Sequence, residues 1–428
     1  MSHLFQELGA GAYQAFRTII PEPHNRIPIS LDAIPSILVS YVPFLFMAFL
    51  ARQENTYIIR LLLLPTVITA SLGTSFRYYW TIPMMNTCNW GSCLGAFVII
   101  GKALDYAFQK DGMLRVDEVR PGQSKGKATA NGSANGHINP PVGGRSIAPW
   151  LTDVVQLTTS MRGISWKYGQ DTYVPKETRP LHRGPFVNAT ILAMVKNFLI
   201  MDILEFILKL FPGVGSVFGG SMFYYSLPPI SRYAVSTFIH ILSGRCLLAG
   251  FEAIYQLVTV VAVGIFNDSP LVWPPILDSP WLSESMHECW SKRWHQLLRR
   301  TFMVYGGYPG KWIAGDFGMV LGIFIASGLY HELSMYAMGR GLDSAPVIFF
   351  ALQAPILVIE RLWRRITGRR VGGWYGRLWV YFVMFVLGQP MINSWHRRGL
   401  AGGLILPPFL SPTRLLVPIS LRFINPSE

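Results

Sequence analysis

The stretch that decides the fold of this chain is FGMVLGIFIASGLYHELSMYAM, residues 317–338. As a helix it is long enough to cross a bilayer, and its only ionisable side chains are those of His331 and Glu332. An ionisable group at that depth loses its hydration, so a bundle keeps it where it finds a partner, a water-filled cavity or a reaction. The stretch therefore predicts chemistry inside a membrane.

The composition of the whole chain indicates a membrane protein. Of the 428 residues, 51% are hydrophobic and 14% are charged, and the mean hydropathy is +0.33. The net charge of +14 does not indicate a nucleic-acid partner, because the basic residues lie mainly in loops between apolar segments, as the positive-inside rule describes. We therefore expect an all-α, polytopic transmembrane helical bundle whose partners include membrane lipids and no nucleic acid.

Hydropathy predicts about seven to nine spans. The third is interrupted by Lys102 and Asp105, and the fifth is long enough for one tilted helix or for a pair bent around Gly244 and Gly250. A proline-broken apolar tail at 400–419 is a candidate for one more. The predicted spans are 34–50, 57–72, 93–108, 189–211, 234–266, 317–338, 345–363 and 378–394.

This pattern divides the chain into three regions. They are N-terminal transmembrane helices at 1–108, a loop at 109–187 that we expect to be disordered at about 122–144, and a larger transmembrane bundle at 188–428. The loop after residue 363 holds four arginines and no acid, which places it in the cytoplasm. Counting back through the spans places the 109–187 and 267–312 loops on the same side.

Two patterns that suggest metal binding are incomplete. Asp202 and Glu205 lie one helical turn apart, but no companion histidine or carboxylate motif accompanies them, and Glu205 can pair with Lys209 at i,i+4. The four cysteines form neither a disulfide framework nor a paired zinc motif. We therefore predict an ion pair at Glu205 and no metal site.

Two interpretations of His331 are open from the residues alone. It is either a packed histidine bonded to a neighbouring helix or a general base. The small residues Ser327 and Gly328 favour the second, because they let another helix or a ligand approach closely. A neutral imidazole can then take a proton from an alcohol.

A second group of residues, WSKRWHQLLRR at 290–300, precedes this stretch. It combines indole rings, which prefer the headgroup zone, with cations that can meet an anionic ligand such as a phosphate-rich donor. The alternative is an interfacial anchor, with the basic residues paired to lipid headgroups.

These two segments resemble the motifs of wax synthase-like enzymes in the membrane-bound O-acyltransferase superfamily. Residues 285–295, SMHECWSKRWH, are similar to the S-L-x-D-F-W-G-R-R-W-[NH] motif, and Ser327 to His331 are similar to S-G-x-x-H. Residues 162–166, RGISW, resemble an R-G-I-G-W element of the fungal members. Four positions depart from the pattern, and these are Glu288, Cys289, Ser291 and Lys292. Glu288 and Lys292 keep the charges of the motif, whereas Cys289 in place of phenylalanine alters the aromatic packing.

The resemblance implies a catalytic core at about 267–395 that transfers an acyl group from a coenzyme A thioester to an alcohol. His331 would be the general base and His295 a donor to the oxyanion. Lys292 and Arg293 would hold the coenzyme A phosphates, with Trp290 and Trp294 beside them. The implied site contains no metal.

Fungal members with these elements resemble O-acetyltransferases of terpenoid or meroterpenoid natural products. We therefore expect an enzyme of the endoplasmic reticulum membrane that uses acetyl-CoA and a hydrophobic alcohol. The alternative within this class is a wax or sterol ester synthase that uses a long-chain acyl-CoA. The alternatives from another class are a transporter, which would typically show repeated halves, and a non-catalytic lipid-binding protein.

Overall fold

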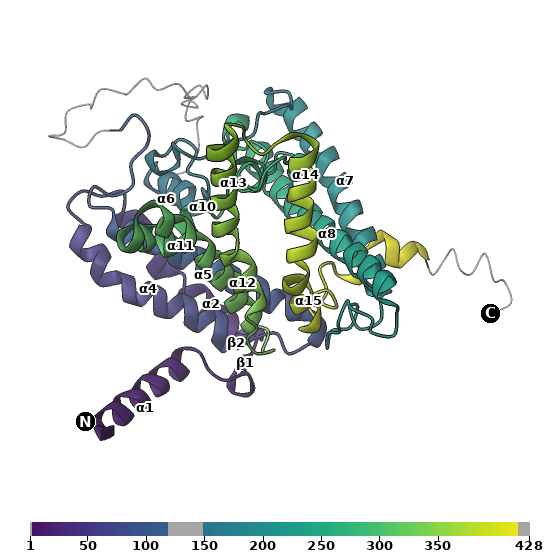
Figure 1. Cartoon of the computed structure of the whole chain (residues 1–428). Helices are drawn as coiled ribbons and strands as arrows, with labels where there is room; N and C mark the ends of the chain where they lie inside the picture. The colour runs from purple at the N-terminus through teal and green to yellow at the C-terminus, as the bar shows by residue number, and fades with distance from the viewer. Residues whose placement is uncertain (1, 119–148, 418–428) are drawn as a thin grey trace.

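The computed structural model describes residues 2–118 and 149–417, and the regular secondary structure of this part of the chain is almost entirely helical (Figure 1). Its only strands are the two-residue β1 (Ile27–Pro28) and β2 (Tyr78–Tyr79), which pair in parallel. The all-α prediction is confirmed. The expected disorder at 122–144 lies outside the described residues.

The N-terminal helices form one packed group. It consists of α2 (Ile34–Val39), α3 (Val42–Leu50), α4 (Tyr57–Arg77), α5 (Asn86–Phe108) and α6 (Pro149–Thr159). Its apolar core includes Phe44, Met47 and Tyr106, together with Leu157 of α6 and Trp166. The segment after α6 therefore packs against the first helices.

The remaining helices form a second, larger core in which α7 packs on α8, α11 packs on α12, and α15 contacts both α8 and α12. Met201, Cys246, Phe324 and Trp395 are among its buried residues. The helices are α7 (Arg183–Lys209), α8 (Pro229–Gly264), α9 (Met286–Glu288), α10 (Arg299–Phe302), α11 (Tyr308–Tyr336), α12 (Ala345–Ala351), α13 (Gln353–Thr367), α14 (Gly373–Phe382) and α15 (Gln389–Arg397).

Six helical segments in the described part of the chain are long and apolar enough to cross a membrane. The 234–266 segment is one continuous helix, α8, and not a bent pair. The extra span at 400–419 is wrong for its described part, because residues 400–411 form turns and one short helix, Pro408–Leu410, where prolines remove backbone donors. The six segments are Leu31–Leu50, Tyr57–Arg77, Pro83–Phe108, Pro229–Gly264, Arg299–Tyr336 and Ala345–Thr367.

The charged residues that interrupt the third predicted span have partners. Both carboxylate oxygens of Asp105 accept hydrogen bonds from Arg300, and Lys102 donates to the carbonyl oxygens of Leu157 and Ser160. These contacts satisfy the charges that interrupt the third predicted span, because a buried charge is tolerated only when it is paired.

The predicted ion pair at Glu205 is also confirmed. Glu205 forms an ion pair with Lys209 and a second ion pair, at 2.8 Å, with Arg414. Asp202 accepts hydrogen bonds from Ser411 and Thr413. Both carboxylates of α7 therefore hold the C-terminal segment.

The segment 299–336 folds as a hairpin of two helical arms. The backbone leaves helical geometry at Ala314 and Gly315, where Gly315 has φ +58°. A Cβ on Gly306 would lie 1.9 Å from the carbonyl oxygen of Gly322, so the arms touch through glycine. Only residues without side chains allow so close a crossing. The predicted span 317–338 therefore corresponds to the second arm.

The predicted cytoplasmic loops lie at one end of the bundle, where Figure 1 shows α6 and α10 on the side opposite β1 and β2. Tyr173 donates a hydrogen bond to Asp278, and Arg377 pairs with Glu284, so three loops distant in sequence contact one another. The prediction that they share a side is confirmed. The cytoplasmic orientation stays a prediction.

Candidate active site

His331 lies on the second arm of α11 with its ring against aromatic side chains. Its imidazole stacks on Phe350 of α12, with ring centroids 5.0 Å apart and an interplanar angle of 12°, and it lies 5.8 Å from Trp395 of α15. Its Nδ1 is buried, and within the described chain it has no hydrogen-bond partner. This nitrogen therefore makes no bond to a neighbouring helix within the described chain, and the role of His331 stays a prediction.

Gly328 explains how α12 reaches this ring. A Cβ on Gly328 would lie 2.7 Å from the Cα of Val347, which leaves no room for a side chain. Because Gly328 and His331 are three residues apart, they share a face of α11. The helix that makes the close approach expected from Ser327 and Gly328 is therefore α12, which carries Phe350.

Glu332 points away from this ring. It forms a buried bidentate ion pair with Arg398, at 2.7 and 2.8 Å, and accepts the backbone N–H of Asp343 at 2.6 Å. The pair ties α11 to the end of α15, the helix that supplies Trp395. Arg398 was not expected from the sequence, although a carboxylate inside a predicted span signals that a cation lies nearby.

The WSKRWH segment, taken as residues 285–295, is held at its start by backbone hydrogen bonds to a buried carboxylate. Glu360 of α13 accepts the N–H groups of Met286 and His287 at 2.7 and 2.9 Å, and the hydroxyl of Ser285 caps the short helix α9. A single π-helical turn, Cys289–Arg293, follows. Sequence reasoning missed Glu360, although it is the one carboxylate in the predicted span 345–363.

Trp290 joins this segment to His331. Its ring centroid lies 5.9 Å from that of Phe324 and 6.3 Å from that of Phe350, and its Nε1 donates to Gln353 at 3.1 Å. Trp290 thus contacts the same phenylalanine on which His331 stacks. The structure therefore brings the two motifs together through aromatic packing.

His295 lies in the same interior. Its ring contacts Trp294 and Phe251, with centroids 5.4 and 6.0 Å apart, and its Nδ1 is buried without a partner in the described chain. Burial lowers the pKa of His295 to about 4, so the imidazole is neutral at physiological pH. His295 and His331 are near enough to interact electrostatically.

Lys292 and Arg293 differ in their surroundings. Lys292 is exposed, with its ammonium 6.0 Å from the ring of Tyr173. Arg293 forms an ion pair with Glu288 at 2.8 Å and donates to the carbonyl oxygen of Asp278 at 3.1 Å. Glu288, which stands where aspartate is usual in the motif, thus forms an ion pair with Arg293 within the loop.

Both motifs fall inside one family match. Residues 273–352 match the model described as "Membrane bound O-acyl transferase family". This segment is therefore similar to that family.

Several curated proteins are similar to parts of this chain. Acetyltransferase spyB of Aspergillus fumigatus is 26% identical over 30% of this chain and 24% of its own length, and O-Mevalon transferase yanI of Aspergillus niger is 25% identical over 50% and 52%. Acetyltransferase ple2 of Rhodocybe pseudopiperita is 24% identical over 59% and 67%. The matched regions thus span about a quarter and about half of the first two relatives. No solved structure matches the chain.

The RGISW element ties the N-terminal helices to the membrane bound O-acyl transferase segment. Arg162 donates to the carbonyl oxygens of Pro274 and Pro275 and to the hydroxyl of Tyr255, at 2.6 to 2.7 Å. Trp166 is buried and faces the guanidinium of Arg115 at 5.0 Å. The element is therefore structural and lies beside the loop that leads to Trp290.

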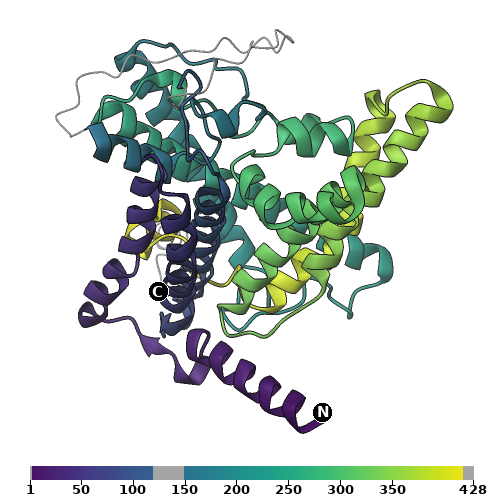
Figure 2. The same cartoon turned by 90° about the vertical axis from the view of Figure 1, so that its left-hand side faces the viewer.

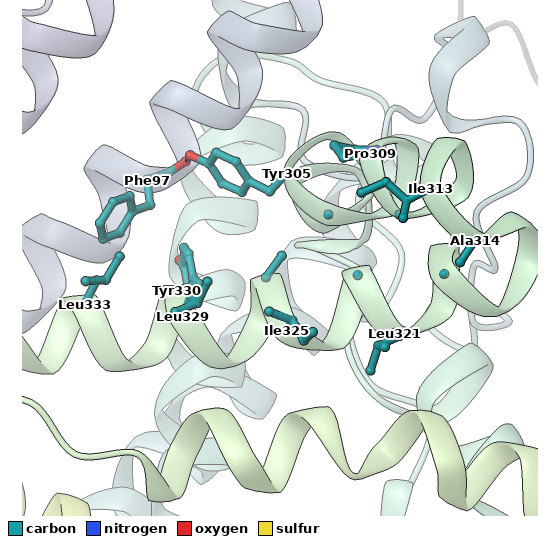
Figure 3. A pocket seen from close by; sticks show the side chains of 15 residues that line it. Phe97, Tyr305, Pro309, Ile313, Ala314, Leu321, Ile325, Leu329, Tyr330 and Leu333 are labelled. Atoms are coloured by element: carbon teal, nitrogen blue, oxygen red, sulfur yellow. Dashed lines mark hydrogen bonds between the residues drawn. The ribbon is translucent and has the colours of Figure 1, made fainter. Parts of the chain in front are cut away.

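A cavity of about 510 Å³ lies between the two arms of the hairpin and α5 (Figure 3). Its lining is apolar, and the hydroxyls of Tyr305 and Tyr330 donate to carbonyl oxygens of α5. The lining positions of α11 include Gly322, Ala326 and Tyr330, and His331 is not among them. The ring of Tyr330 lies 5.3 Å from that of His331, so this side chain stands between the cavity and the histidine.

The described residues include no group of three or more side chains suited to hold a metal ion. Unpartnered buried nitrogens in this interior include Nδ1 of His331 and Nε1 of Trp395, whose rings contact each other. These groups suit hydrogen bonding to an oxygen atom of a neutral ligand.

Proposed function

We propose that this protein is an acyl-CoA:alcohol O-acyltransferase that transfers an acetyl group from acetyl-CoA to a hydroxyl of a terpenoid or meroterpenoid intermediate. The observation that carries the proposal is the placement of His331 in an aromatic interior, close to His295 and the WSKRWH segment. The names of the relatives, five acetyltransferases and one O-Mevalon transferase, favour an acyl group transferred in fungal secondary metabolism.

The proposed reaction starts from His331, whose Nδ1 has no hydrogen-bond partner in the described chain. Nδ1 of His331 is enclosed, so Nε2 is the nitrogen that takes the proton from the attacking alcohol. The alcohol oxygen then bonds to the thioester carbonyl carbon, and a donor such as His295 stabilises the oxyanion. Collapse of this intermediate breaks the C–S bond, and the coenzyme A thiolate takes the proton back from His331.

The donor would approach from the end of the bundle that carries Lys292. Lys292 is the exposed cation of the WSKRWH segment, so it meets the coenzyme A phosphates first. The Nε and Nη1 groups of Arg293 bond to Glu288 and Asp278, so Nη2 is the group that it would offer to a phosphate. Trp290 and Trp294 pack against each other and line the path towards His331.

We infer that the enzyme resides in the endoplasmic reticulum, with this end of the bundle towards the cytoplasm, where acyl-CoA is available. The acceptor is a hydrophobic alcohol, because such a molecule partitions into the bilayer around a site of this depth.

The test is transfer by membranes enriched in the protein. Labelled acetyl-CoA is incubated with a panel of terpenoid and meroterpenoid alcohols, and labelled palmitoyl-CoA is run in parallel, with the His331→Ala variant as the matched control. We expect labelled acetate esters from the unaltered protein and none above background from the variant. Transfer only from palmitoyl-CoA would replace the acetyl proposal with a long-chain ester synthase. No transfer from either donor across the panel would overturn the proposed activity.

A further inference from the structure

The N-terminal helix α1 (Ser2–Ile19) has one apolar and one polar side. At 100° per residue, Leu8, Ala12, Phe16 and Ile19 share a face. The opposite face carries Gln6, Glu7, Gln14, Arg17 and Thr18. Residues 1–33 lack a continuous apolar run, so the hydropathy of the chain does not indicate this helix.

The apolar face of α1 is left uncovered. Leu8 is 60% exposed and Phe16 is 45% exposed. The base of the helix is attached to the bundle, where it contacts α4 and where Arg17 donates to the hydroxyl of Tyr336 at 3.3 Å. Figures 1 and 2 both show α1 projecting from the bundle beside β1. The bundle therefore holds the base of the helix and leaves its apolar face open.

The sequence of α1 is poorly suited to an isolated helix in water. Gly9 and Gly11 lie in its interior, and a Cβ at either position would meet nothing within 4 Å, so packing does not require glycine there. Glycine lowers helix stability, and short helices in water depend on a packed apolar face. The helix therefore needs a surface that covers Leu8 and Phe16.

That surface adjoins the lipid-facing helices. The chain continues from α1 into the first membrane segment, where Leu31, Leu38 and Val39 are 83%, 63% and 66% exposed. Between residues 6 and 20 the charged side chains are Glu7 and Arg17, which cancel. A partner recognised by charge is therefore not indicated, whereas burial of an apolar face in a bilayer interface requires none.

We propose that α1 lies in the membrane interface at the end of the bundle opposite the WSKRWH segment, with Leu8 and Phe16 inserted among the lipids. Because the helix carries no net charge over its described side chains, a zwitterionic bilayer is sufficient. The inference is independent of the proposed acyl transfer.

The test is site-directed spin labelling of the full chain in phosphatidylcholine nanodiscs. Single cysteines replace Leu8 or Phe16 on the apolar face and Gln6 or Gln14 on the polar face, in a Cys88→Ser background, because the other three cysteines are buried. Collision with oxygen reports lipid, and collision with a water-soluble nickel chelate reports solvent. We expect the ratio of oxygen to nickel accessibility to be several-fold higher for L8C and F16C than for Q6C and Q14C.

Equal nickel accessibility on both faces would overturn the proposal, because the helix would then be solvated. Dipolar broadening between like labels in discs that hold two copies would also overturn it, because a second chain would then cover the face. A preference for oxygen that develops only when phosphatidylserine is added would contradict the apolar basis of the binding.

Discussion

At the residue scale, His331 differs from the other histidines that the structure describes in being stacked on a phenylalanine. We predict that His331→Ala lowers turnover by about two to four orders of magnitude, because loss of a general base costs that much. Turnover is measured at matched membrane abundance. His24→Ala, at an exposed histidine, is the control and should keep full activity. More than about a tenth of the original turnover in the His331 variant would contradict the base assignment.

His295 predicts a dependence of stability on pH. Its folded-state pKa of about 4 lies below the value of about 6.5 expected when the chain is unfolded. Between these values the unfolded chain takes up a proton that the folded protein does not, so stability is full above pH 6.5 and falls as the pH is lowered towards 4. We expect His295→Gln to make this fall shallower in thermal unfolding in detergent, whereas His24→Gln leaves it unchanged. Identical slopes for both variants would contradict the burial of a neutral His295.

At the scale of the elements, the crossing of α11 and α12 depends on Gly328. A Cβ at this position would lie 2.7 Å from the Cα of Val347, so Gly328→Ala must move α12 and with it Phe350. We predict at least a tenfold loss of turnover with a destabilisation of about 1–3 kcal/mol, the usual cost of overpacking. Gly244→Ala in α8 is the matched control, because its Cβ would meet nothing within 4 Å. Equal effects of the two substitutions on turnover would argue against this role.

The pair between Glu332 and Arg398 joins α11 to α15. Both side chains are buried, so removal of one partner leaves a charge without compensation. We predict that Glu332→Gln or Arg398→Met destabilises the protein by about 3–5 kcal/mol, and that the double variant recovers part of the loss. The midpoint of thermal unfolding in detergent measures both effects. Additive losses in the double variant would show that the two side chains act independently.

At the scale of the whole molecule, the loops that contact one another at the α6 and α10 end should all face the cytoplasm. Arg340 and Arg369 flank the membrane segment Ala345–Thr367 on opposite sides, and both are exposed. We predict that an impermeant maleimide labels R369C but not R340C in sealed microsomes with the cytoplasmic face outward, in the Cys88→Ser background. Detergent should expose both. The reverse labelling would invert the topology and move the WSKRWH end away from cytoplasmic acyl-CoA.

The sequence by itself determined the helical membrane class, most of the spans and the two motifs, because apolar runs of bilayer length and rare intramembrane charges are local signals. The pairing of Glu205 with Lys209 was likewise predictable, since i,i+4 neighbours always meet on a helix. Only the tertiary structure decided that Arg398 neutralises Glu332, that Glu360 holds the WSKRWH segment and that Phe350 stacks on His331. These partners lie on different helices, and their meeting depends on how the helices cross, which hydropathy does not encode. The crossing at Gly328 is an example, because the missing side chain signals a close approach and does not say which helix makes it.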